Sequence, residues 1–369
     1  MKRLADICDI QYGYAFDSKC FTEDSSYPQL VRIRDVKRGY SETYYSGNYP
    51  DEYILSEGDL LIGMDGEFNI ARWKCSGALL NQRVCKLTTK VGTNEEYLRF
   101  AMLKSLKEIE QRTAFVTVKH LSAKELNKLE LDVPELTKQD KIADTLSRLE
   151  RVIEARKEEL EELDELIKAR FVEMFGDMLL NSKNWPEVRL DEIADIVSGI
   201  TKGRKIKEQE LFEVPYMAVS NVKDGYIDWT TVKTVMASQA EIDKYQLKPF
   251  DVLMTEGGDP DKVGRGAIIH EPPKNCIHQN HIFRVRLNRG TLLPEYMEQY
   301  LQQQKAKRYF LGCAKQTTGI ASINMRQLTG LPVVVPEMQL QKEYVSFVHQ
   351  VDKSKLNKIA ARWPAKAVA

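Results

Sequence analysis

RLADICDI occupies residues 3–10 and is followed by Gly13, and RLDEIADI occupies residues 189–196 and is followed by Gly199. The offset of 186 residues grows through small insertions but its order is never scrambled. It reaches 192 at Asp59 and Asp251, 199 at Glu96 and Glu295, and 202 where Val133-Pro134-Glu135 returns as Val335-Pro336-Glu337. This drift indicates duplication of a whole domain-sized unit rather than a short solenoid repeat.

Composition favours a soluble two-unit protein. Of 369 residues, 43% are hydrophobic and 29% charged, so each unit can bury a core. The longest apolar runs, such as 333–335, are too short to span a bilayer, and Asp6 interrupts any signal-peptide pattern. Six scattered cysteines without a C-x-x-C pair indicate reduced thiols. We therefore expect a cytoplasmic protein without a membrane partner.

The net charge is zero, but its sign varies along the chain. Residues 135–177 carry 13 acids against 8 bases, and residues 178–369 carry 21 acids against 27 bases. A strong grip on DNA phosphates would therefore need locally clustered Arg and Lys, or a partner.

A heptad pattern follows the first repeat. Apolar residues or arginines recur at alternating steps of four and three, which predicts a coiled-coil helix over 135–177 of roughly 58 Å. The alternative is an ordinary amphipathic helix on a globular core. Thr137 is the expected N-cap and Gly176 the expected stop. The apolar seam comprises Ile142, Leu146, Leu149, Ile153, Leu160, Leu163, Ile167 and Met174, with arginine at 156 and 170.

The second repeat ends on the same pattern, with Tyr344, Val348 and Val351 at the seam positions. Lys355 and Lys358 weaken this seam, and Pro364 limits the helix to about 26 residues. Two helices that each follow an equivalent domain pack most simply antiparallel. We therefore expect domains at 1–134 and 178–335, a central helix at 135–177 and a short C-terminal helix at 336–369.

Each domain has the pattern of an α+β fold. Short strands are expected at 30–34, 59–62 and 71–73, and again at 216–219, 251–254 and 267–269. Gly-rich loops at 63–69 and 255–266 follow the central strands, and single helices are expected at 95–111 and 294–309. The fold class is thus α+β, with two duplicated globular domains joined by long antiparallel coiled-coil helices.

The order and duplication of these motifs resemble the specificity subunit of Type I restriction-modification systems. The motifs are the opening strand, the D-L/V-L strand, the Asn-Gln pair, the V-P-E exit and the heptad spacer. The resemblance implies that each domain is a target-recognition domain reading half of a bipartite double-stranded DNA site. It implies helices that set the spacing and dock two methyltransferase subunits, and motor-nuclease subunits that join the full complex. The C-terminal helix, shorter and more basic than the central one, departs from this pattern.

The resemblance also implies that this chain is non-catalytic and binds no cofactor. S-adenosylmethionine would be bound by the methyltransferase subunits, and ATP and Mg by the motor-nuclease subunits. The sequence agrees, since it has no P-loop and no N/D-P-P-Y/F loop. Glu271-Pro272-Pro273-Lys274 is interpreted as a turn. Cys276-x-His278-x-x-His281 has no second ligand pair nearby, so we predict no metal site.

Candidate DNA-reading residues follow from chemistry and repeat position. Arg and Lys suit guanine or phosphate, and Asn and Gln suit adenine, when they lie on loops that can approach a groove. In the first domain the candidates are Arg32, Arg34, Lys37, Arg38, Asn69, Arg72, Gln82, Arg83, Lys119 and His120. In the second domain they are Lys202, Arg204, Lys205, Ser220, Asn221, Lys223, Lys262, Arg265, Asn280, His281, Lys315, Gln316, Asn324 and Arg326.

Two other functions compete with DNA recognition. One is a fused methyltransferase or nuclease, which S-adenosylmethionine binding by the isolated chain would favour. The other is a coiled-coil scaffold or transcription regulator with duplicated ligand-binding domains. Retention of a bipartite DNA only in the presence of methyltransferase subunits would exclude it.

Overall fold

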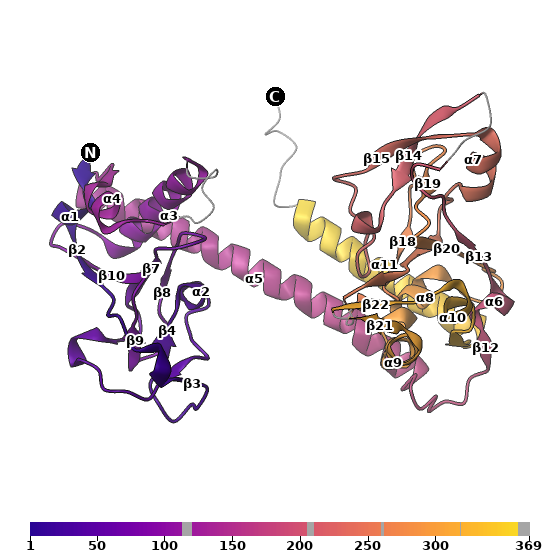
Figure 1. The fold of residues 1–369 in the computed structure, drawn as a ribbon, viewed down its shortest axis with the longest axis horizontal. Coiled ribbons are helices and arrows are strands. Elements are labelled where there is room, and N and C mark those ends of the chain that lie inside the picture. Colours follow the sequence, from indigo (N-terminus) through magenta and orange to yellow (C-terminus); the bar gives the residue numbers. More distant parts are fainter. Residues whose placement is uncertain (113–119, 205–209, 260–261, 318, 361–369) are drawn as a thin grey trace. The chain divides into compact units, whose positions relative to one another are not determined.

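The computed structural model describes residues 1–112, 120–204, 210–259, 262–317 and 319–360. It divides into two compact units, Met1–Lys157 (unit 1) and Glu158–Ala369 (unit 2). The boundary lies inside one long helix, α5 (Leu136–Phe175), which contributes residues to both units (Figure 1). The sequence predicts four parts, two globular domains and two helices counted separately. The two compact units instead each include part of α5 together with a globular part.

The two units share a set of equivalent elements in the same order, and each adds elements of its own. Before α5, the chain forms β1 (Lys2–Arg3), α1 (Leu4–Ile7), β2 (Cys8–Tyr12), β3 (Phe21–Thr22), β4 (Leu30–Val31), α2 (Ile33–Val36), β5 (Tyr44–Tyr45), β6 (Ile54–Leu55), β7 (Leu60–Gly63), β8 (Asn69–Arg72), β9 (Ala78–Leu80), β10 (Val84–Thr89), α3 (Glu95–Arg112), α4 (Ala123–Lys128) and β11 (Glu130–Leu131). After α5, it forms β12 (Glu187–Arg189), α6 (Leu190–Ile193), β13 (Ala194–Ser198), β14 (Phe212–Met217), β15 (Lys233–Ala237), α7 (Gln239–Tyr245), β16 (Asp251–Thr255), β17 (Gly257–Gly258), β18 (Gly266–Ile269), β19 (Ile277–His278), β20 (Ile282–Leu287), α8 (Pro294–Leu301), α9 (Gln304–Cys313), β21 (Lys315–Thr317), β22 (Ile320–Ser322), α10 (Met325–Thr329), β23 (Pro332–Val334) and α11 (Met338–Ala360).

A four-stranded antiparallel sheet forms the centre of each unit. Its order is β2-β10-β7-β8 in unit 1 and β13-β20-β16-β18 in unit 2. A smaller mixed sheet accompanies each, β4-β9-β6 and β15-β14-β19, with one parallel pair in each. The four-stranded sheet is therefore duplicated in topology, whereas the smaller sheets share the parallel pair and differ in which strand is central; the α+β class is confirmed.

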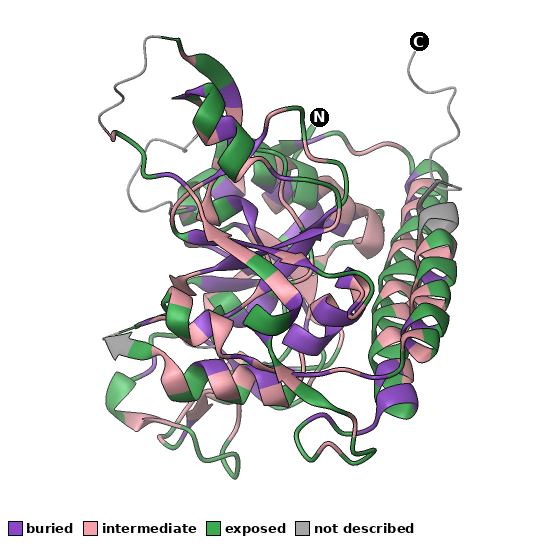
Figure 2. Ribbon diagram, turned by 90° about the vertical axis from the view of Figure 1, so that its right-hand side faces the viewer, coloured by how far each residue is buried: buried purple, intermediate pink, exposed green. Residues whose placement is uncertain are grey.

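The central strands β7 and β16 are buried on both faces, which explains their nearly continuous apolar sequences. Leu60 and Ile62 pack into one core cluster of unit 1 while Leu61 packs into another. Val252 and Leu253 divide in the same way in unit 2. Buried residues accordingly concentrate along the sheets in Figure 2. The Gly-rich loop that follows each central strand therefore begins at a tightly packed, buried position.

Two strand predictions were wrong in detail. The opening motif is not one strand, because Leu4–Ile7 forms a helical turn that buries Leu4 and Ile7 before β2 begins. The strand expected over 30–34 ends at Val31, and α2 follows, with the Asp35 carboxylate accepting a hydrogen bond from the Arg32 backbone N–H. At α2 this local cap competes successfully with strand propensity, whereas α1 has no side-chain cap and instead buries Leu4 and Ile7.

The chain leaves each globular part through the same glutamine-centred contact. The buried Gln139 side chain accepts a hydrogen bond from Asn94 N (2.9 Å) and donates to Gly92 O (3.1 Å) and Pro134 O (2.8 Å). The buried Gln341 side chain makes the equivalent three hydrogen bonds to the backbone around 291–293 and to Pro336 O. This identity fixes the structural alignment of α5 with α11 at an offset of 202 residues.

Helix ends were predicted with mixed success. Thr137 is not the N-cap, because α5 begins at Leu136 and the Thr137 hydroxyl donates instead to the Glu135 carboxylate (3.0 Å). Gly176 is confirmed as the stop, since it has φ +82°, a conformation that suits glycine. The helix expected over 294–309 is two helices. Gln303 adopts an extended conformation between α8 and α9, after which Ala306 and Phe310 enter the core.

Helix α11 packs antiparallel against the unit 2 part of α5. The Tyr344 ring lies 5.4 Å and 5.5 Å from the rings of Phe171 and Phe175, and Lys355 Nζ lies 2.6 Å from Asp164 Oδ1. Among the predicted seam residues, Leu149 is 54% exposed. Met174, Tyr344 and Val351 are buried, and Ile142, Leu146, Ile153, Leu160, Leu163, Ile167 and Val348 are half-buried.

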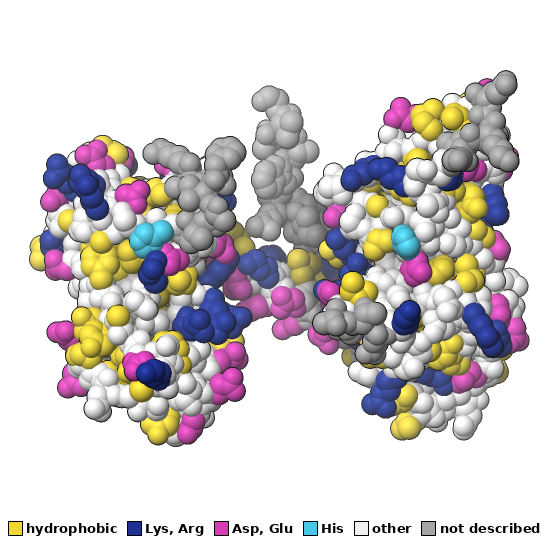
Figure 3. Space-filling model, in the orientation of Figure 1, with side chains coloured by type: hydrophobic (Ala, Val, Ile, Leu, Met, Phe, Trp, Pro, Cys, Tyr) yellow, Lys and Arg dark blue, Asp and Glu magenta, His cyan; other side chains and the backbone are white. Residues whose placement is uncertain are grey.

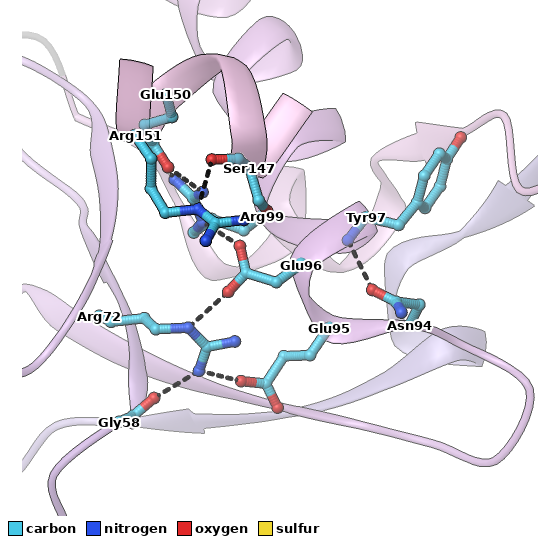
Figure 4. Close-up of polar contacts among 10 residues, drawn as sticks. All are labelled: Gly58, Arg72, Asn94, Glu95, Glu96, Tyr97, Arg99, Ser147, Glu150 and Arg151. Carbon is cyan, nitrogen blue, oxygen red and sulfur yellow. Dashed lines mark hydrogen bonds and ion pairs between the residues drawn. The ribbon is translucent and has the colours of Figure 1, made fainter. Parts of the chain in front are cut away.

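In unit 1, an ion-pair network joins β8, α3 and α5 (Figure 4). Arg72 contacts Glu95 (2.5 Å) and Glu96 (2.6 Å), and Arg99 contacts Glu96 (2.8 Å) and makes a bidentate pair with Glu150 (3.0 and 2.5 Å). Burial opposes ionisation of Glu96, but hydrogen bonds from Arg99 and Arg72 hold its pKa below the ordinary value. The network fixes how α5 leaves the sheet of unit 1.

Unit 2 has a glutamate at the corresponding place. The offset of 199 residues that relates α3 to α8 aligns Arg99 with Glu298. The half-buried Glu298 carboxylate accepts a hydrogen bond from Ile268 N (2.8 Å). Desolvation raises the pKa of Glu298 to about 7, with smaller contributions from Glu295 and Asp352. The folded protein therefore holds a proton on Glu298 that the unfolded chain releases near its ordinary pKa of 4.5.

Glu298→Gln is expected to stabilise the protein at pH 8 by about 1–2 kcal/mol, and much less at pH 4. A raised carboxyl pKa favours folding fully below pH 4.5, and this contribution is lost as the pH rises to about 7. The neutral glutamine removes that loss. Thermal or urea unfolding of both proteins at pH 4 and pH 8 measures the difference. Equal gains at both pH values would contradict the expectation.

Candidate nucleic-acid interface

A glycine in each opening motif, Gly13 or Gly199, packs directly against the backbone of the segment that carries candidate DNA-reading residues. Gly13 N donates to Val84 O (3.0 Å), and a Cβ at Gly13 would lie 2.0 Å from Asn81 O. A Cβ at Gly199 would lie 1.9 Å from His278 O. Only glycine permits this close crossing of two backbone segments. The segments that carry the Asn-Gln pair are therefore held rigidly at the same place in both units.

In unit 1 this crossing presents a polar cluster. Arg83 Nη1 donates to Asp65 Oδ2 (2.8 Å) and lies 3.2 Å from His120 Nδ1, and His120 also contacts the Asp65 carboxylate. Arg83 adopts φ +71°, which is unusual for a residue with a side chain. Its side chain is 52% exposed and that of His120 is 45% exposed, whereas Asp65 is 18% exposed. Asp65, which is largely shielded from solvent, thus orients two exposed basic side chains, Arg83 and His120.

Unit 2 repeats the backbone of this cluster with different side chains. Glu256 N donates to His281 O (3.0 Å), as Met64 N donates to Arg83 O (2.9 Å). His281 Nδ1 lies 2.5 Å from Glu256 Oε2, and Asn280 Nδ2 lies 3.4 Å from His281 Nε2. His281 is therefore the structural counterpart of Arg83. In each unit, an acidic residue that follows the central strand therefore pairs with an exposed basic side chain.

Four predicted residues of unit 1 line one groove of about 440 Å³. Arg32, Arg34, Gln82 and Arg83 contribute to it, together with two phenylalanines. Arg83 therefore belongs both to the groove and to the cluster described above. Basic side chains also form patches among acidic ones on the face drawn in Figure 3. This arrangement offers fixed hydrogen-bond donors on a surface that is not uniformly positive.

In unit 2 the Gly-rich loop is tied to a small sheet. Gly257 and Gly258 of β17 pair with β22, which pairs with β21. Lys262, in the same loop, contacts the Asp259 carboxylate, and the exposed Lys315 lies on β21. The loop is longer than its unit 1 counterpart and presents different side chains.

Some candidates are engaged in contacts within the protein. Asn221 is fully buried, and its amide bonds to Ala218 N and Asp228 O. Arg204 pairs with the Glu241 carboxylate, and Arg72 belongs to the network of Figure 4. In this conformation these side chains hold the fold together.

The remaining candidates are described by exposure. Lys119 and Lys205 lie outside the described residues, as does the side chain of Gln316. The exposed candidates are Arg32, Arg34, Lys37, Arg38, Gln82, Arg83, His120, Lys202, Ser220, Lys262, His281, Lys315, Asn324 and Arg326; the half-buried ones are Asn69, Arg72, Arg204, Lys223, Arg265 and Asn280. Their role in reading DNA stays a prediction.

Sequence reasoning missed the two acids, Asp65 and Glu256. Both lie in the Gly-rich loops that follow β7 and β16, but only Arg, Lys, Asn, Gln, Ser and His were considered as readers. A carboxylate accepts hydrogen bonds from cytosine N4, so it is also a base-reading group. Its position directly after a buried strand was the signal available in the sequence.

The Cys276-x-His278-x-x-His281 motif is divided by burial. His278 is buried, with ring nitrogens 3.2 Å from Tyr245 O and Val197 O, and burial lowers the pKa of His278 to about 4. His281 is exposed and pairs with Glu256. In the part of the chain that the structure describes, no three His, Cys, Asp or Glu side chains are grouped closely enough to hold a metal ion. No described helix is long and apolar enough to cross a membrane.

Known proteins resemble the chain over nearly its whole length. The family model described as the Type I restriction modification DNA specificity domain matches residues 1–165 and again 182–362. The Type I restriction enzyme EcoBI specificity subunit of Escherichia coli is 27% identical, over 94% of this chain and 78% of the relative. The EcoKI specificity subunit of E. coli K12 is 23% identical, over 66% of this chain and 55% of the relative.

Solved structures share the fold. The S subunit of a Type I restriction-modification system from M. genitalium superposes with a TM-score of 0.56 at 16% identity, covering 96% of this chain and 90% of that one. A chain from a structural study of complex assembly and conformational transition of the type I R-M system gives a TM-score of 0.51 at 18% identity, covering 98% and 91%. With the duplicated topology and two family-model matches, the chain belongs to the Type I restriction-modification DNA specificity family, whose members are non-catalytic DNA-recognition components.

Proposed function

We propose that this chain is the sequence-reading subunit of a Type I restriction-modification complex, in which each unit reads one half of an asymmetric, bipartite double-stranded DNA site. One observation carries the proposal. The two units place an exposed basic side chain at the same backbone position, but the side chains differ. Arg83 lies beside Asp65 in unit 1, and His281 lies beside Glu256 in unit 2. A common scaffold with different readers suits the recognition of two different sequences.

The chemistry of the pairs supports two unlike half-sites. An arginine is the side chain best suited to guanine O6 and N7, and a carboxylate accepts from cytosine N4. His281 with Asn280 offers a different set of donors and acceptors. The modified motif should therefore be asymmetric and split by unspecified bases.

In this proposal α5 and α11 set the gap between half-sites and dock two methyltransferase subunits, and motor-nuclease subunits complete the restriction complex. The chain works in the cytoplasm and binds neither S-adenosylmethionine nor ATP and Mg, which the partner subunits hold. Its zero net charge and the acid beside each base suit a reader that relies on partners for phosphate contacts.

Purified alone, the chain is expected neither to methylate nor to cut DNA, and to bind DNA weakly with a steep loss on adding salt. Methyltransferase subunits with S-adenosylmethionine should restore tight, sequence-dependent binding and methylation. Gel-shift and methyl-transfer assays with and without those subunits measure this. Robust methyl transfer by the single chain, or partner-independent specific binding, would overturn the proposal.

A further inference from the structure

The duplication allows a residue-by-residue comparison where each globular part meets its exit helix. The matching contacts of Gln139 and Gln341 fix the helix alignment, so Glu150 corresponds to Asp352. The α3–α8 alignment makes Arg99 correspond to Glu298. The cation of unit 1 is thus replaced by an acid in unit 2.

In unit 1 the Arg99 guanidinium fills this junction. It bridges Glu96 and Glu150 (Figure 4). It also lies 4.1 Å from the centre of the Phe100 ring. Its side chain is only 11% exposed. A planar cation with five donors satisfies two carboxylates at once.

In unit 2 the equivalent junction is a cavity of about 400 Å³. Glu295, Glu298 and Asp352, the counterparts of Glu96, Arg99 and Glu150, line it, and Asp164 and Asp224 add two more carboxyl groups. The acids of the unit 1 site are therefore kept or increased in number, while the guanidinium between them is gone.

The basic side chains of unit 2 that line this cavity pair with only some of its carboxyl groups. Lys355 is shared between Asp164 (2.6 Å) and Asp352 (3.2 Å), and Lys168 pairs with Glu165 (2.8 Å). His349 approaches Glu295 at 3.7 Å from an exposed position. The remaining histidine of the lining, His270, is exposed and lies edge-on to the Phe250 ring. None of the ion pairs formed by the described residues gives Glu298 a cationic partner.

Two buried polar groups on the cavity wall add an independent observation. Tyr344 and Gln299 line the cavity and are 1% and 8% exposed, and the Tyr344 hydroxyl and Gln299 Nε2 have no hydrogen-bond partner within the described residues. Leaving such buried groups unpaired is destabilising. A guanidinium can donate a hydrogen bond to the Tyr344 hydroxyl oxygen, whereas Gln299 Nε2 is itself a donor and needs an acceptor that a guanidinium does not supply.

We propose that this cavity of unit 2 binds an alkylguanidinium group supplied from outside the chain, in the place that Arg99 occupies in unit 1. Carboxyl oxygens of Glu295, Glu298 and Asp352 accept the guanidinium hydrogen bonds, and the remaining volume accommodates an aliphatic stem. The group belongs either to a small molecule or to an arginine side chain of a bound subunit. The chemistry is the same in both cases, and the experiment below separates the two sources.

The test uses butylguanidinium as the probe and neutral butylurea as its matched control, with the full chain in calorimetric titrations. We expect binding of butylguanidinium on the order of 1 mM or tighter and none of butylurea. Glu298→Arg, which recreates the unit 1 arrangement, should abolish binding. Asp352→Asn should weaken it about tenfold. Absence of probe binding to the natural chain would overturn the proposal. So would folded Glu298→Arg and Asp352→Asn proteins that bind the probe as tightly as the natural chain does.

Unit 1 supplies a chemical-rescue control. Arg99→Ala removes the built-in guanidinium, so its lowered melting temperature should rise again with butylguanidinium and not with butylurea. No rescue, or the same rise with butylurea, would show that these junctions do not select a guanidinium.

A last arm identifies the source and rests on the proposed function. Titration is repeated on the complex with methyltransferase subunits. Loss of the probe site on assembly, with weaker assembly of Glu298→Arg, assigns an arginine of a partner. Retention of the probe site assigns a small molecule. Probe binding by the chain alone is independent of DNA reading, so failure here is distinguishable from failure of the proposed function.

Discussion

Inserting four residues after Glu159 is expected to lengthen the unspecified gap of the DNA site by about one or two base pairs, with both half-sites unchanged. The insertion lies within α5, close to the boundary between the two units after Lys157. Four residues add about 6 Å of helix and rotate the seam only about 40° beyond one turn. At roughly 3.4 Å per base pair, this lengthening is one to two base pairs. Sequencing of methylated sites measures the gap.

A seven-residue insertion at the same point is the matched control for rotation. It adds about 10.5 Å, returns the seam to within about 20° of its register, and should lengthen the gap by about three base pairs. Methylation at the original sites should be lost in both proteins. An unchanged gap in both insertion mutants would mean that α5 docks partners without setting spacing. A changed half-site would mean that the insertion disturbs the reading surfaces.

Replacing Arg83 by alanine is expected to relax one half-site and leave the other as it was. Arg83 is an exposed base held by Asp65, and a good arginine–guanine contact contributes about 1–3 kcal/mol of discrimination, or roughly 5- to 150-fold. His281→Ala should relax only the other half-site, because His281 is the unit 2 counterpart. Methylation rates on a panel of sites with single base changes measure both effects.

Arg72→Ala is the matched control for the loss of an arginine from unit 1. Arg72 is held by Glu95, Glu96 and Gly58 O, so its removal should lower the melting temperature without changing the preferred bases. If Arg72→Ala altered the half-site as much as Arg83→Ala, the cluster around Asp65 would not be the reading element.

The architecture was predictable because the determining signals are periodic or repeated. The heptad seam from Ile142 to Met174 predicts α5, and the doubled motifs at Gly13 and Gly199 predict equivalent units. Gly176 marks the helix end because few other residues adopt φ +82° so readily. These features depend on spacing along the chain and need no tertiary information.

The functional surface was less predictable because it depends on partners distant in sequence. Asp65 meets Arg83 and His120 only after the sheet has formed, and Arg72 meets Glu95 and Glu96 across a strand and a helix. A sequence pattern identifies which side chains are able to read bases. It does not identify which of them are already engaged with an acid of the same fold.

The most direct test of the account is methylome sequencing of cells that carry this chain together with its methyltransferase subunits. If each unit reads one half-site, the methylated motif is asymmetric, consists of two unlike half-sites separated by a fixed number of unspecified bases, and is present only when this chain is expressed. A continuous or palindromic motif, or an identical motif in cells that lack the chain, would contradict it.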